Sequence, residues 1–378
     1  MVFATQGLKV QVAHDFDAAL ADGSGLSLVS PDEWDALLAG AASNVVFLTR
    51  QWLATWWRHF GAEGDCRLHL LILRDEGGAL AGIAPLFVAR EPLPPVKVHR
   101  RGEQRPEREG EPVRVVQLVG GIDVADYLDV IAPAERIEQV WASVLDYLLE
   151  RRGEWDAIDF HSLPEWSPSR EVLPRVAEAR GLRFDVFPED VCPVIDLPEE
   201  WNTYLMSLRK KDRHELRRKV RKLEGREDSH WYLVSPSDPE AVERAMNVFL
   251  DLHRQSGADK AHFMDSQMEA YFRDMARELL PTGWVDLAIL EMDGQPASAY
   301  FSYNYGDRLY LYNSGYSPRF ASYSAGVALL AYRIHKAIIQ KLHCFDFLRG
   351  DEEYKYDFGA KDTYVYRALC QAGDGTAA

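Results

Sequence analysis

The sequence predicts a mixed α/β (α+β) protein built as two domains, each with a mixed central sheet flanked by helices. The chain has 378 residues, of which 47% are hydrophobic and 27% charged, enough for two domains with their own cores. Both halves alternate short β-branched or aromatic runs with longer runs whose apolar residues recur every three or four positions. Each half follows the order hairpin, strand, helix, strand, so we place the domains at residues 1–188 and 189–378.

The bulk properties argue against several classes of protein. A formal net charge of −16 argues against DNA binding through the general surface. The four cysteines (Cys66, Cys192, Cys344 and Cys370) lie far apart, which argues against a disulfide framework or a zinc site. The apolar runs are shorter than a membrane span, and the N-terminal residues contain no signal-peptide core. We expect a soluble cytoplasmic protein with no metal and no membrane insertion.

The first half is predicted to begin with a weakly ordered lead-in over residues 1–30 and to continue with two helices. Ser30, Pro31 and Glu33 form a capping-box pattern, which predicts that a helix starts there. Thr49 is expected to cap the second helix, whose tryptophans recur at helical spacing and are expected in the core.

Strands and helices then alternate to the end of the first half. The proline-rich residues 91–112 are expected to form an exposed loop, and they are assigned no function. A helix is predicted from about residue 133 and another over residues 170–180. The predicted strands are residues 68–73, 81–89, 113–119, 127–131, 156–160 and 184–187.

The second half is predicted to begin with a strand and three helices, the first of which is long and basic. Between residues 209 and 226 there are ten Lys or Arg against three Asp or Glu. One interpretation is a solvated helix face that balances acidic neighbours. The other is a basic wall for a phosphorylated donor, a nucleotide-linked acceptor or RNA. The predicted elements are the strand 194–197 and the helices 201–223, 240–255 and 267–280.

A strand–loop–helix–strand unit follows, after a hairpin of residues 285–291 and 297–305. Residues 309–313 are rich in aromatics and predict a strand, and residues 327–342 carry apolar residues at helical spacing. Residues 345–348 predict a second strand. Because a helix connects these two strands, we expect them to run parallel.

The loop of residues 317–324 and the helix start after it form a candidate phosphate site. The first backbone N–H groups of a helix have no intrahelical partners, and they lie at the positive end of its dipole. Together they suit a phosphate or pyrophosphate. An ordinary capped helix is the competing interpretation. The candidate residues are Arg319 as a countercharge, Ser322 or Ser324 as the cap, and Ala325, Gly326 and Val327 in the first turn.

Three segments of the chain resemble a known family. They are residues 47–61 (FLTRQWLATWWRHFG), residues 323–326 (YSAG) and residues 345–355 (FDFLRGDEEYK). They resemble the GNAT N-acyltransferase superfamily and, more narrowly, the CelD/BcsL acetyltransferases, which are related to the Fem aminoacyltransferases. The superfamily's phosphate loop is degenerate here, since Arg319 is followed by FASYS and only Gly326 remains. The resemblance implies tandem GNAT-like domains.

In GNAT enzymes, two parallel strands diverge and the acyl-CoA donor binds between them. The resemblance assigns these strands to residues 309–313 and 345–348, with Asn313 and Arg349 near the reacting centre. It makes Asp346 or Asp351 a candidate general base, because partial desolvation raises the pKa of a carboxylate toward neutrality. The competing interpretation of these charged residues is a structural ion-pair network around Gly350. The candidate acids for the leaving thiolate are Tyr316 and Tyr354, and the candidate anion-stabilising group is Lys355.

The first half is predicted to lack a donor site. Residues 132–135 offer no Gly/Ser loop, and Glu135 and Glu138 would repel a phosphate. Asp123, Asp126 and Asp129 form an acidic cluster that suits the ammonium of an amine acceptor, although a solvated loop explains it equally well.

Three functions fit these patterns. The first is transfer of an acyl group, with acetyl expected, from acyl-CoA to an amine of a small molecule, sugar or cell-envelope precursor. The second, implied by the Fem relatives, uses aminoacyl-tRNA as the donor, and the basic residues 209–226 favour it. The third is a non-catalytic binding protein in polysaccharide biosynthesis, which the degenerate loop favours.

Overall fold

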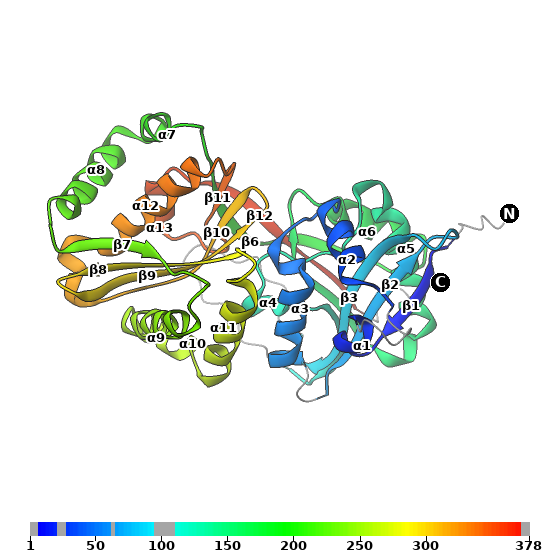
Figure 1. Ribbon diagram of the computed structural model, residues 1–378. Coiled ribbons are helices and arrows are strands. Elements are labelled where there is room, and N and C mark those ends of the chain that lie inside the picture. Colours follow the sequence, from blue (N-terminus) through cyan, green and yellow to red (C-terminus); the bar gives the residue numbers. More distant parts are fainter. Residues whose placement is uncertain (1–6, 21–27, 62–64, 94–109, 372–378) are drawn as a thin grey trace. The chain divides into compact units, whose positions relative to one another are not determined.

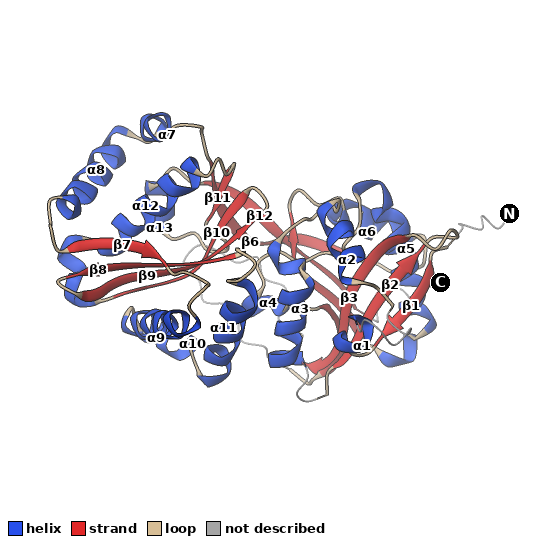
Figure 2. Cartoon of the chain, in the orientation of Figure 1, coloured by secondary structure: helices blue, strands red, loops and turns tan. Residues whose placement is uncertain are grey.

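The computed structural model describes residues 7–20, 28–61, 65–93 and 110–371. Its contacts divide the chain into two compact units. The first unit comprises Met1–Asp190 with Tyr364–Ala378, and the second comprises Val191–Thr363. The chain passes from the first unit to the second within β6 (Asp185–Asp196) and returns within β12 (Lys361–Gln371). Each unit has a mixed sheet flanked by helices, so the predicted fold class is confirmed (Figure 2).

The strands of the first unit lie in the order β1-β2-β3-β4-β5-β12. Neighbours from β1 to β4 are antiparallel, β4 and β5 are parallel, and β12 is antiparallel to β5. The predicted hairpin of β2 and β3 is confirmed. The bounds are β1 Lys9–Ala13, β2 Arg67–Arg74, β3 Leu80–Glu91, β4 Val113–Leu118 and β5 Ala157–Pro164.

Helices cover both faces of this sheet. A Cβ at Gly82 would lie 2.5 Å from Val140, so α5 packs directly onto β3 on one face. Trp56 of α3 contacts Phe87 of β3 on the other face. The helices are α1 Phe16–Leu20, α2 Pro31–Ala39, α3 Arg50–Trp56, α4 Gly121–Val124, α5 Ile137–Glu150 and α6 Ser169–Glu178. The shorter turns are η1 Val46–Leu48, η2 Trp57–Gly61, η3 Ala134–Arg136 and η4 Arg152–Glu154.

Both predicted helix caps in the first unit are confirmed. Ser30 N–H donates to Glu33 at 2.9 Å, and Glu33 N–H donates to Ser30 Oγ at 3.2 Å, which completes the capping box of α2. The side chain of Thr49 accepts from Trp52 N–H at the start of α3. These contacts satisfy backbone donors that the helices themselves leave without partners.

The strands of the second unit lie in the order β6-β11-β10-β9-β8-β7. Asp293 and Gly294 both have positive φ, at 53° and 66°, and turn the chain between β8 and β9 as predicted. β10 and β11 are parallel, also as predicted, and the other neighbouring strands of this unit are antiparallel. The bounds are β7 Ser229–Leu233, β8 Val285–Met292, β9 Gln295–Tyr305, β10 Arg308–Tyr316 and β11 Cys344–Asp346.

Figure 1 shows α8 and α12 on one face of β8, β9 and β10, and α9, α10 and α11 on the other. Leucines and alanines of α12 form a core with Leu309 and Leu311 of β10 on the first face. On the second face, the aromatic rings of Phe249, Phe272 and Phe301 pack together. The helices are α7 Trp201–Ser207, α8 Lys210–Glu224, α9 Pro239–Gln255, α10 Ala258–Phe263, α11 Ser266–Leu279, α12 Ala325–Ile339 and α13 Glu353–Asp357, with the turn η5 Pro318–Tyr323.

Several sequence predictions are wrong. The single helix over residues 201–223 is two helices, because Leu208 adopts an extended backbone (ψ 149°) and buries its side chain. Residues 127–131 are buried but form only one isolated bridge, from Ile131 to Ile83. Part of the expected lead-in forms β1, which pairs with β2. Most of the expected loop at residues 91–112 lies outside the described residues.

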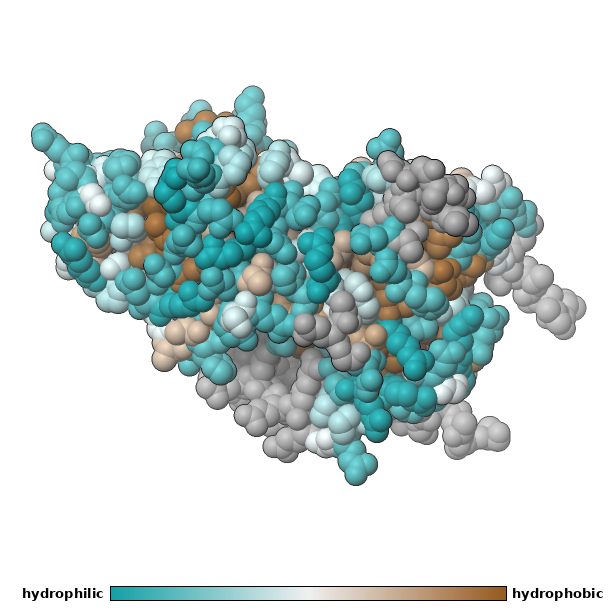
Figure 3. Space-filling view, turned by 60° about the horizontal axis from the view of Figure 1, so that its bottom comes forward, coloured by the Kyte–Doolittle hydropathy of each residue, from teal (hydrophilic) through white to brown (hydrophobic). Residues whose placement is uncertain are grey.

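The visible surface agrees with the charged composition. The face drawn in Figure 3 is covered mainly by hydrophilic residues. Among the described residues, no helix is long and apolar enough to cross a membrane. All four cysteines lie in the described part of the chain and are free thiols, so the predicted lack of a disulfide framework is confirmed.

Candidate functional site

The two parallel strands of the second unit diverge after three residue pairs. Arg308, Leu309 and Tyr310 of β10 pair with β11, and β10 then continues to Tyr316 without a further β11 partner. On its other side β10 stays paired with β9, with a bulge between Leu311 and Asn313. Residues 311–316 therefore carry one open edge on the β11 side, which can hydrogen-bond an extended ligand as another strand would.

Side chains from the end of α9 and from α10 occupy part of this open edge. Lys260 Nζ donates to the carbonyl of Ser314 at 2.6 Å and lies 3.2 Å from its hydroxyl. Ser256 Oγ accepts from the N–H of Tyr316 at 2.8 Å. Burial lowers the pKa of Lys260, while Glu352 opposes this shift. Neither Ser256 nor Lys260 was a sequence candidate, since a lone Ser or Lys after a helix carries no signal.

The predicted phosphate loop borders a hollow of about 210 Å³. The N-cap residue of α12 is Ser324, which has a left-handed backbone (φ 56°), but its side chain makes no capping hydrogen bond. The expectation of a serine side-chain cap is therefore wrong. The first-turn N–H groups are left without a side-chain cap at the wall of the hollow. The lining residues are Tyr316, Ser317, Phe320, Ala321, Ser324, Ala325, Gly326 and Val327.

The other two candidates of this loop point elsewhere. Arg319 is exposed, and its guanidinium lies 5.3 Å from the ring centroid of Phe320. Ser322 uses its carbonyl to accept from Lys222 Nζ at 2.8 Å. Neither residue lines the hollow. The cation at this loop thus comes from α8, in agreement with the interpretation of residues 209–226 as a basic wall for a phosphorylated donor.

Gly326 faces free space. A Cβ added there would meet only Ser298 Oγ and Tyr300 Oη, both at 3.8 Å, which is ordinary contact. Tyr300 Oη donates to the carbonyl of Gly326 at 2.8 Å and so fixes the first turn of α12 on the sheet. The position is therefore open to a ligand group on its N–H side and held firmly on its carbonyl side.

The basic helix α8 lies beside the start of α12. Lys222 and Arg226, just beyond its C-terminus, each lie 4.7 Å from the ring centroid of Tyr323. A second hollow, of about 120 Å³, is lined by Lys211 and Lys219 of α8 together with Val327. Because Val327 lines both hollows, the cations of α8 border the same helix start as the uncapped N–H groups.

The two candidate acids border these hollows. Tyr316 lines the first and Tyr354 lines the second. Tyr354 keeps 39% of its surface exposed, while one side of its ring contacts Phe347. Burial raises the pKa of Tyr354, and Glu352 raises it further. The phenol is therefore protonated at neutral pH, and its raised pKa makes it a weaker acid than a free tyrosine.

The turn after β11 is held by structural contacts. Lys355, which is 2% exposed, donates through Nζ to the carbonyls of Arg349 and Gly350 at 2.9 and 2.8 Å and pairs with Glu352. Asp346 is fully buried, pairs with Arg308 at 2.8 Å and accepts from Leu348 N–H. These contacts favour the structural interpretation for Asp346 and Lys355. Asp351 follows Gly350 directly and is half-buried.

Asn313 faces α9 rather than the hollow. It interacts with His253, which is 1% exposed, and β10 approaches α9 so closely that a Cβ at Gly315 would lie 2.4 Å from His253 N. Burial lowers the pKa of His253 to about 4, and the nearby Lys260 lowers it too. His253 is therefore uncharged at neutral pH. Arg349, another candidate near the reacting centre, is half-buried in the turn after β11.

In the first unit the acidic cluster is only partly accessible. Asp129 is fully buried and accepts from Ser43 at 2.7 Å, from Ser169 at 2.6 Å and from Ser167. Burial raises its pKa, although these hydroxyls oppose the shift. Asp126 is 9% exposed and Asp123, in the first turn of α4, is exposed. The proposed acceptor role therefore remains open only for Asp123 and Asp126.

Comparison with known proteins agrees with this geometry. Residues 210–356 match the family described as the acetyltransferase (GNAT) domain. None of the curated proteins matches the sequence. The matched residues contain β10, the phosphate loop, α12 and β11, which together form the candidate site.

Solved structures show the fold of nearly the whole chain. A crystal structure of FemX aligns with a TM-score of 0.61 at 11% identity, over 90% of this chain and 96% of that one. A conserved protein of unknown function from Bacteroides thetaiotaomicron gives 0.55 at 11%, over 91% and 98%. L-PGS from Bacillus licheniformis gives 0.53 at 14%, over 92% and 93%. The second unit thus matches a GNAT acetyltransferase domain, and the narrower CelD/BcsL assignment stays a prediction.

Proposed function

We propose that the second unit is an acyl-CoA-dependent N-acyltransferase, which transfers an acyl group, acetyl in the simplest case, to an amine of a small molecule, sugar or cell-envelope precursor. One observation carries the proposal. The uncapped start of α12 borders a hollow and follows the open edge of β10. A helix start without a side-chain cap can bind a pyrophosphate, and an open strand edge can hydrogen-bond the amides of an extended pantetheine chain.

The donor can be held by groups already in place. Its pyrophosphate would accept from the N–H groups of Ala325, Gly326 and Val327, with Lys219 and Lys222 of α8 as nearby countercharges. Its pantetheine amides would bond the backbone of Ser314 and Tyr316. These backbone groups bond Lys260 and Ser256 in the free protein, so donor binding replaces one set of hydrogen bonds with another.

The transfer needs one base and one acid. The acceptor nitrogen attacks the thioester carbon, a C–N bond forms, and the nitrogen gives up its proton to a base. The C–S bond then breaks, and the leaving thiolate takes a proton from an acid. We assign the base to Asp351, which is half-buried at the turn after β11, and the acid to Tyr354 or Tyr316.

Calorimetric titration with acetyl-CoA tests the donor. We expect one donor molecule per chain, because Glu135 and Glu138 at the start of η3 and α5 in the first unit would repel a phosphate. Thiol release in the presence of a panel of amines then tests the transfer. Two equivalent sites would contradict the assignment to one unit. If neither acetyl-CoA nor longer acyl-CoAs bind, the assignment of acyl-CoA as the donor is wrong, and a non-catalytic binding protein is favoured.

Replacing Lys260 with Met tests the exchange of hydrogen bonds at the open edge. The variant leaves the Ser314 carbonyl free for the donor, so we expect the donor to bind about tenfold more tightly, as losing one competing hydrogen bond predicts. Lys336→Met, in the last turn of α12, is the matched control and should leave the affinity unchanged. Weaker binding by Lys260→Met would mean that Lys260 contacts the donor instead of competing with it.

An aminoacyl-tRNA donor is the second candidate function. The observation that favours it is the cluster of cations on α8, where Arg217 and Arg221 have no ion pair among the described residues. The fold shared with FemX is consistent with this candidate. Arg218, in contrast, pairs with Glu215 at 2.7 Å, so part of the positive charge is balanced.

Replacing Arg217, Arg218 and Arg221 with Gln separates the two donors. If tRNA binds α8, the triple variant should bind it at least tenfold more weakly and with a flatter dependence on salt, because fewer counterions are released. Filter binding of tRNA at several salt concentrations measures this. Arg175→Gln, Arg183→Gln and Arg244→Gln together remove the same charge elsewhere and form the control. Equal tRNA binding by wild type and variant would leave α8 as a solvated face.

A further inference from the structure

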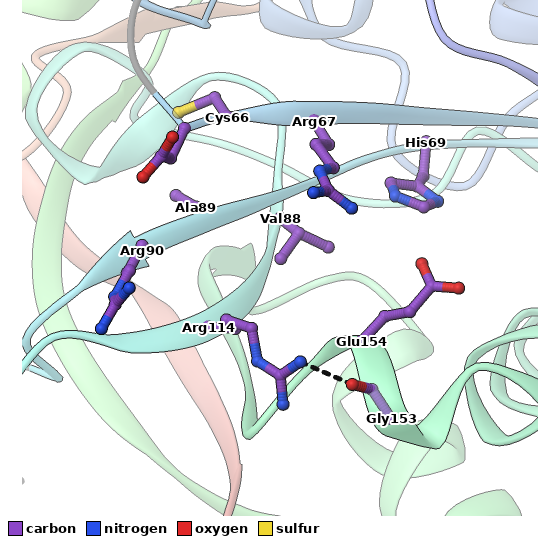
Figure 4. A pocket seen from close by; sticks show the side chains of 10 residues that line it. Cys66, Arg67, His69, Val88, Ala89, Arg90, Arg114, Gly153 and Glu154 are labelled. Atoms are coloured by element: carbon purple, nitrogen blue, oxygen red, sulfur yellow. Dashed lines mark hydrogen bonds between the residues drawn. The ribbon is translucent and has the colours of Figure 1, made fainter.

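The first unit contains a hollow of about 560 Å³ that the proposed function does not use. It lies where β2 and β4 begin, β3 ends and the turn η4 follows α5 (Figure 4). A volume of this size is typical of small-molecule sites. The lining side chains include three arginines and two carboxylates, which is a high density of charge for one concavity.

Two of the three arginines are available to a ligand. Arg114 is held by Asp156, with Nε and Nη2 donating to its carboxylate at 2.9 and 2.7 Å, and by the carbonyl of Gly153. Arg67 and Arg90, in contrast, are exposed and make no ion pair with any described residue. Neither guanidinium has a carboxylate partner among the described residues. Each therefore suits a carboxylate or phosphate group, which a guanidinium binds in a bidentate way.

The acidic side of the hollow is also available. Asp65 and Glu154 line it, are exposed and make no ion pair among the described residues. Arg67 and Glu154 extend into the same space from opposite walls in Figure 4. The wall beside them is His69, which is buried and shares a hydrogen bond with Tyr147 Oη at 2.7 Å. Burial lowers the pKa of His69 to about 4, so it adds no charge at neutral pH.

From these contacts we infer that the hollow binds a small zwitterion, an amino acid or a short peptide. Its carboxylate would pair with Arg67 or Arg90, and its ammonium would pair with Glu154 or Asp65. Among the described lining residues, the aliphatic side chains are Val88 and Ala89 and the only ring is that of the buried His69, so these residues offer no stacking platform for a nucleobase. Two arginines and two carboxylates without an ion pair to any described residue line the hollow, and the carboxylates would repel a simple anion.

A calorimetric screen of the full-length protein tests this inference. The probes are the twenty free amino acids and a panel of dipeptides, with inorganic phosphate as the simple anion. For each dipeptide that binds, its N-acetyl form lacks the ammonium and its C-terminal amide lacks the carboxylate. We expect both derivatives to bind at least about tenfold more weakly, because each loses one charge-assisted pair.

Variants connect the binding to the hollow. Arg67→Gln with Arg90→Gln should abolish the preference for the free carboxylate, and Glu154→Gln should weaken the preference for the free ammonium. Arg183→Gln, an exposed arginine of the same unit outside the hollow, is the control and should bind normally. Circular dichroism and thermal melting of each variant confirm that the fold is intact.

The outcomes decide the matter. Binding of an amino acid or dipeptide that needs both of its charges, and is lost in the variants of the hollow, supports the inference. Binding of phosphate alone, or binding that the variants do not change, overturns it, as does a screen in which no probe binds. Acetyl-CoA binding is measured in the same samples, and since it belongs to the second unit, its loss or retention does not affect this result.

Discussion

The Gly326→Asp variant is expected to fold and to bind acyl-CoA with an affinity about a hundredfold or more lower than that of the wild type. The new carboxylate would stand in the first turn of α12, where the pyrophosphate is proposed to lie. Two like charges at roughly 4 Å repel by several kcal/mol for a doubly charged group at an intermediate dielectric, which corresponds to this loss. Stability should fall little, since a carboxylate at a helix N-terminus suits the dipole.

Gly326→Ala is the matched control for this variant. Its Cβ has ordinary contacts of 3.8 Å, so we expect nearly normal stability and donor affinity. Acetyl-CoA titration and thermal melting of both variants give the answer together. Unchanged affinity in Gly326→Asp, with a normal melting curve, would show that the pyrophosphate binds elsewhere. If Gly326→Ala also lost the donor, crowding rather than charge would be the cause.

The stability of the first unit is expected to depend on His161. The ring is 4% exposed, and its nitrogens contact Glu189 at 2.5 Å and Asp159 at 3.0 Å. Burial alone would lower the pKa of His161, but Glu189 and Asp159 outweigh burial and raise it to about 9. Asp159 also accepts from Arg367 Nε at 2.7 Å. The charged imidazolium thus joins two carboxylates in the folded protein.

The direction of the pH effect follows from this shift. An unfolded histidine titrates near pH 6.5, so the stabilisation is complete below that pH and is lost as the pH rises through about 9. The difference between a pKa of about 9 in the folded protein and 6.5 in the unfolded chain corresponds to about 3 kcal/mol in the free energy of unfolding. Urea unfolding between pH 6 and pH 10 should therefore show stability falling in the wild type, with a flatter curve in His161→Gln.

His230→Gln supplies the comparison for this experiment. His230 is an exposed histidine, so the variant should follow the wild-type curve at every pH. If His161→Gln also followed that curve, protonation of the ring would not be what stabilises the folded protein.

Local patterns of sequence were enough to predict the centre of the candidate site. The aromatic run before Asn313, the helical spacing after Val327 and the short apolar run at Phe345 predict two parallel strands joined by a helix, and the structure contains them. The reason is physical: hydrophobic periodicity and turn residues act over a few positions, so a single sequence records them. The capping box of Ser30 and Glu33 is predictable for the same reason.

Contacts between residues distant in sequence were not predictable. Lys260 reaches Ser314 only because the fold brings α10 to β10, and no local pattern records that contact. For Lys355 the sequence left two roles open, stabilising an anion in the reaction or joining a structural network, and in the structure three backbone carbonyls surround its ammonium. A charged side chain near a site serves structure or chemistry according to its partners, and the sequence does not name them.

The path of β12 has a consequence for the order in which the protein forms. This strand pairs with β5 from Pro164 to Ala157, yet about 200 residues of chain separate the two. It also brings Arg367 to the buried Asp159. Because synthesis runs from the N-terminus, β5 has no partner on this side until the last strand leaves the ribosome. The first unit is begun first and completed last, so a nascent chain that stops before residue 361 leaves an exposed strand edge and a buried carboxylate without its arginine.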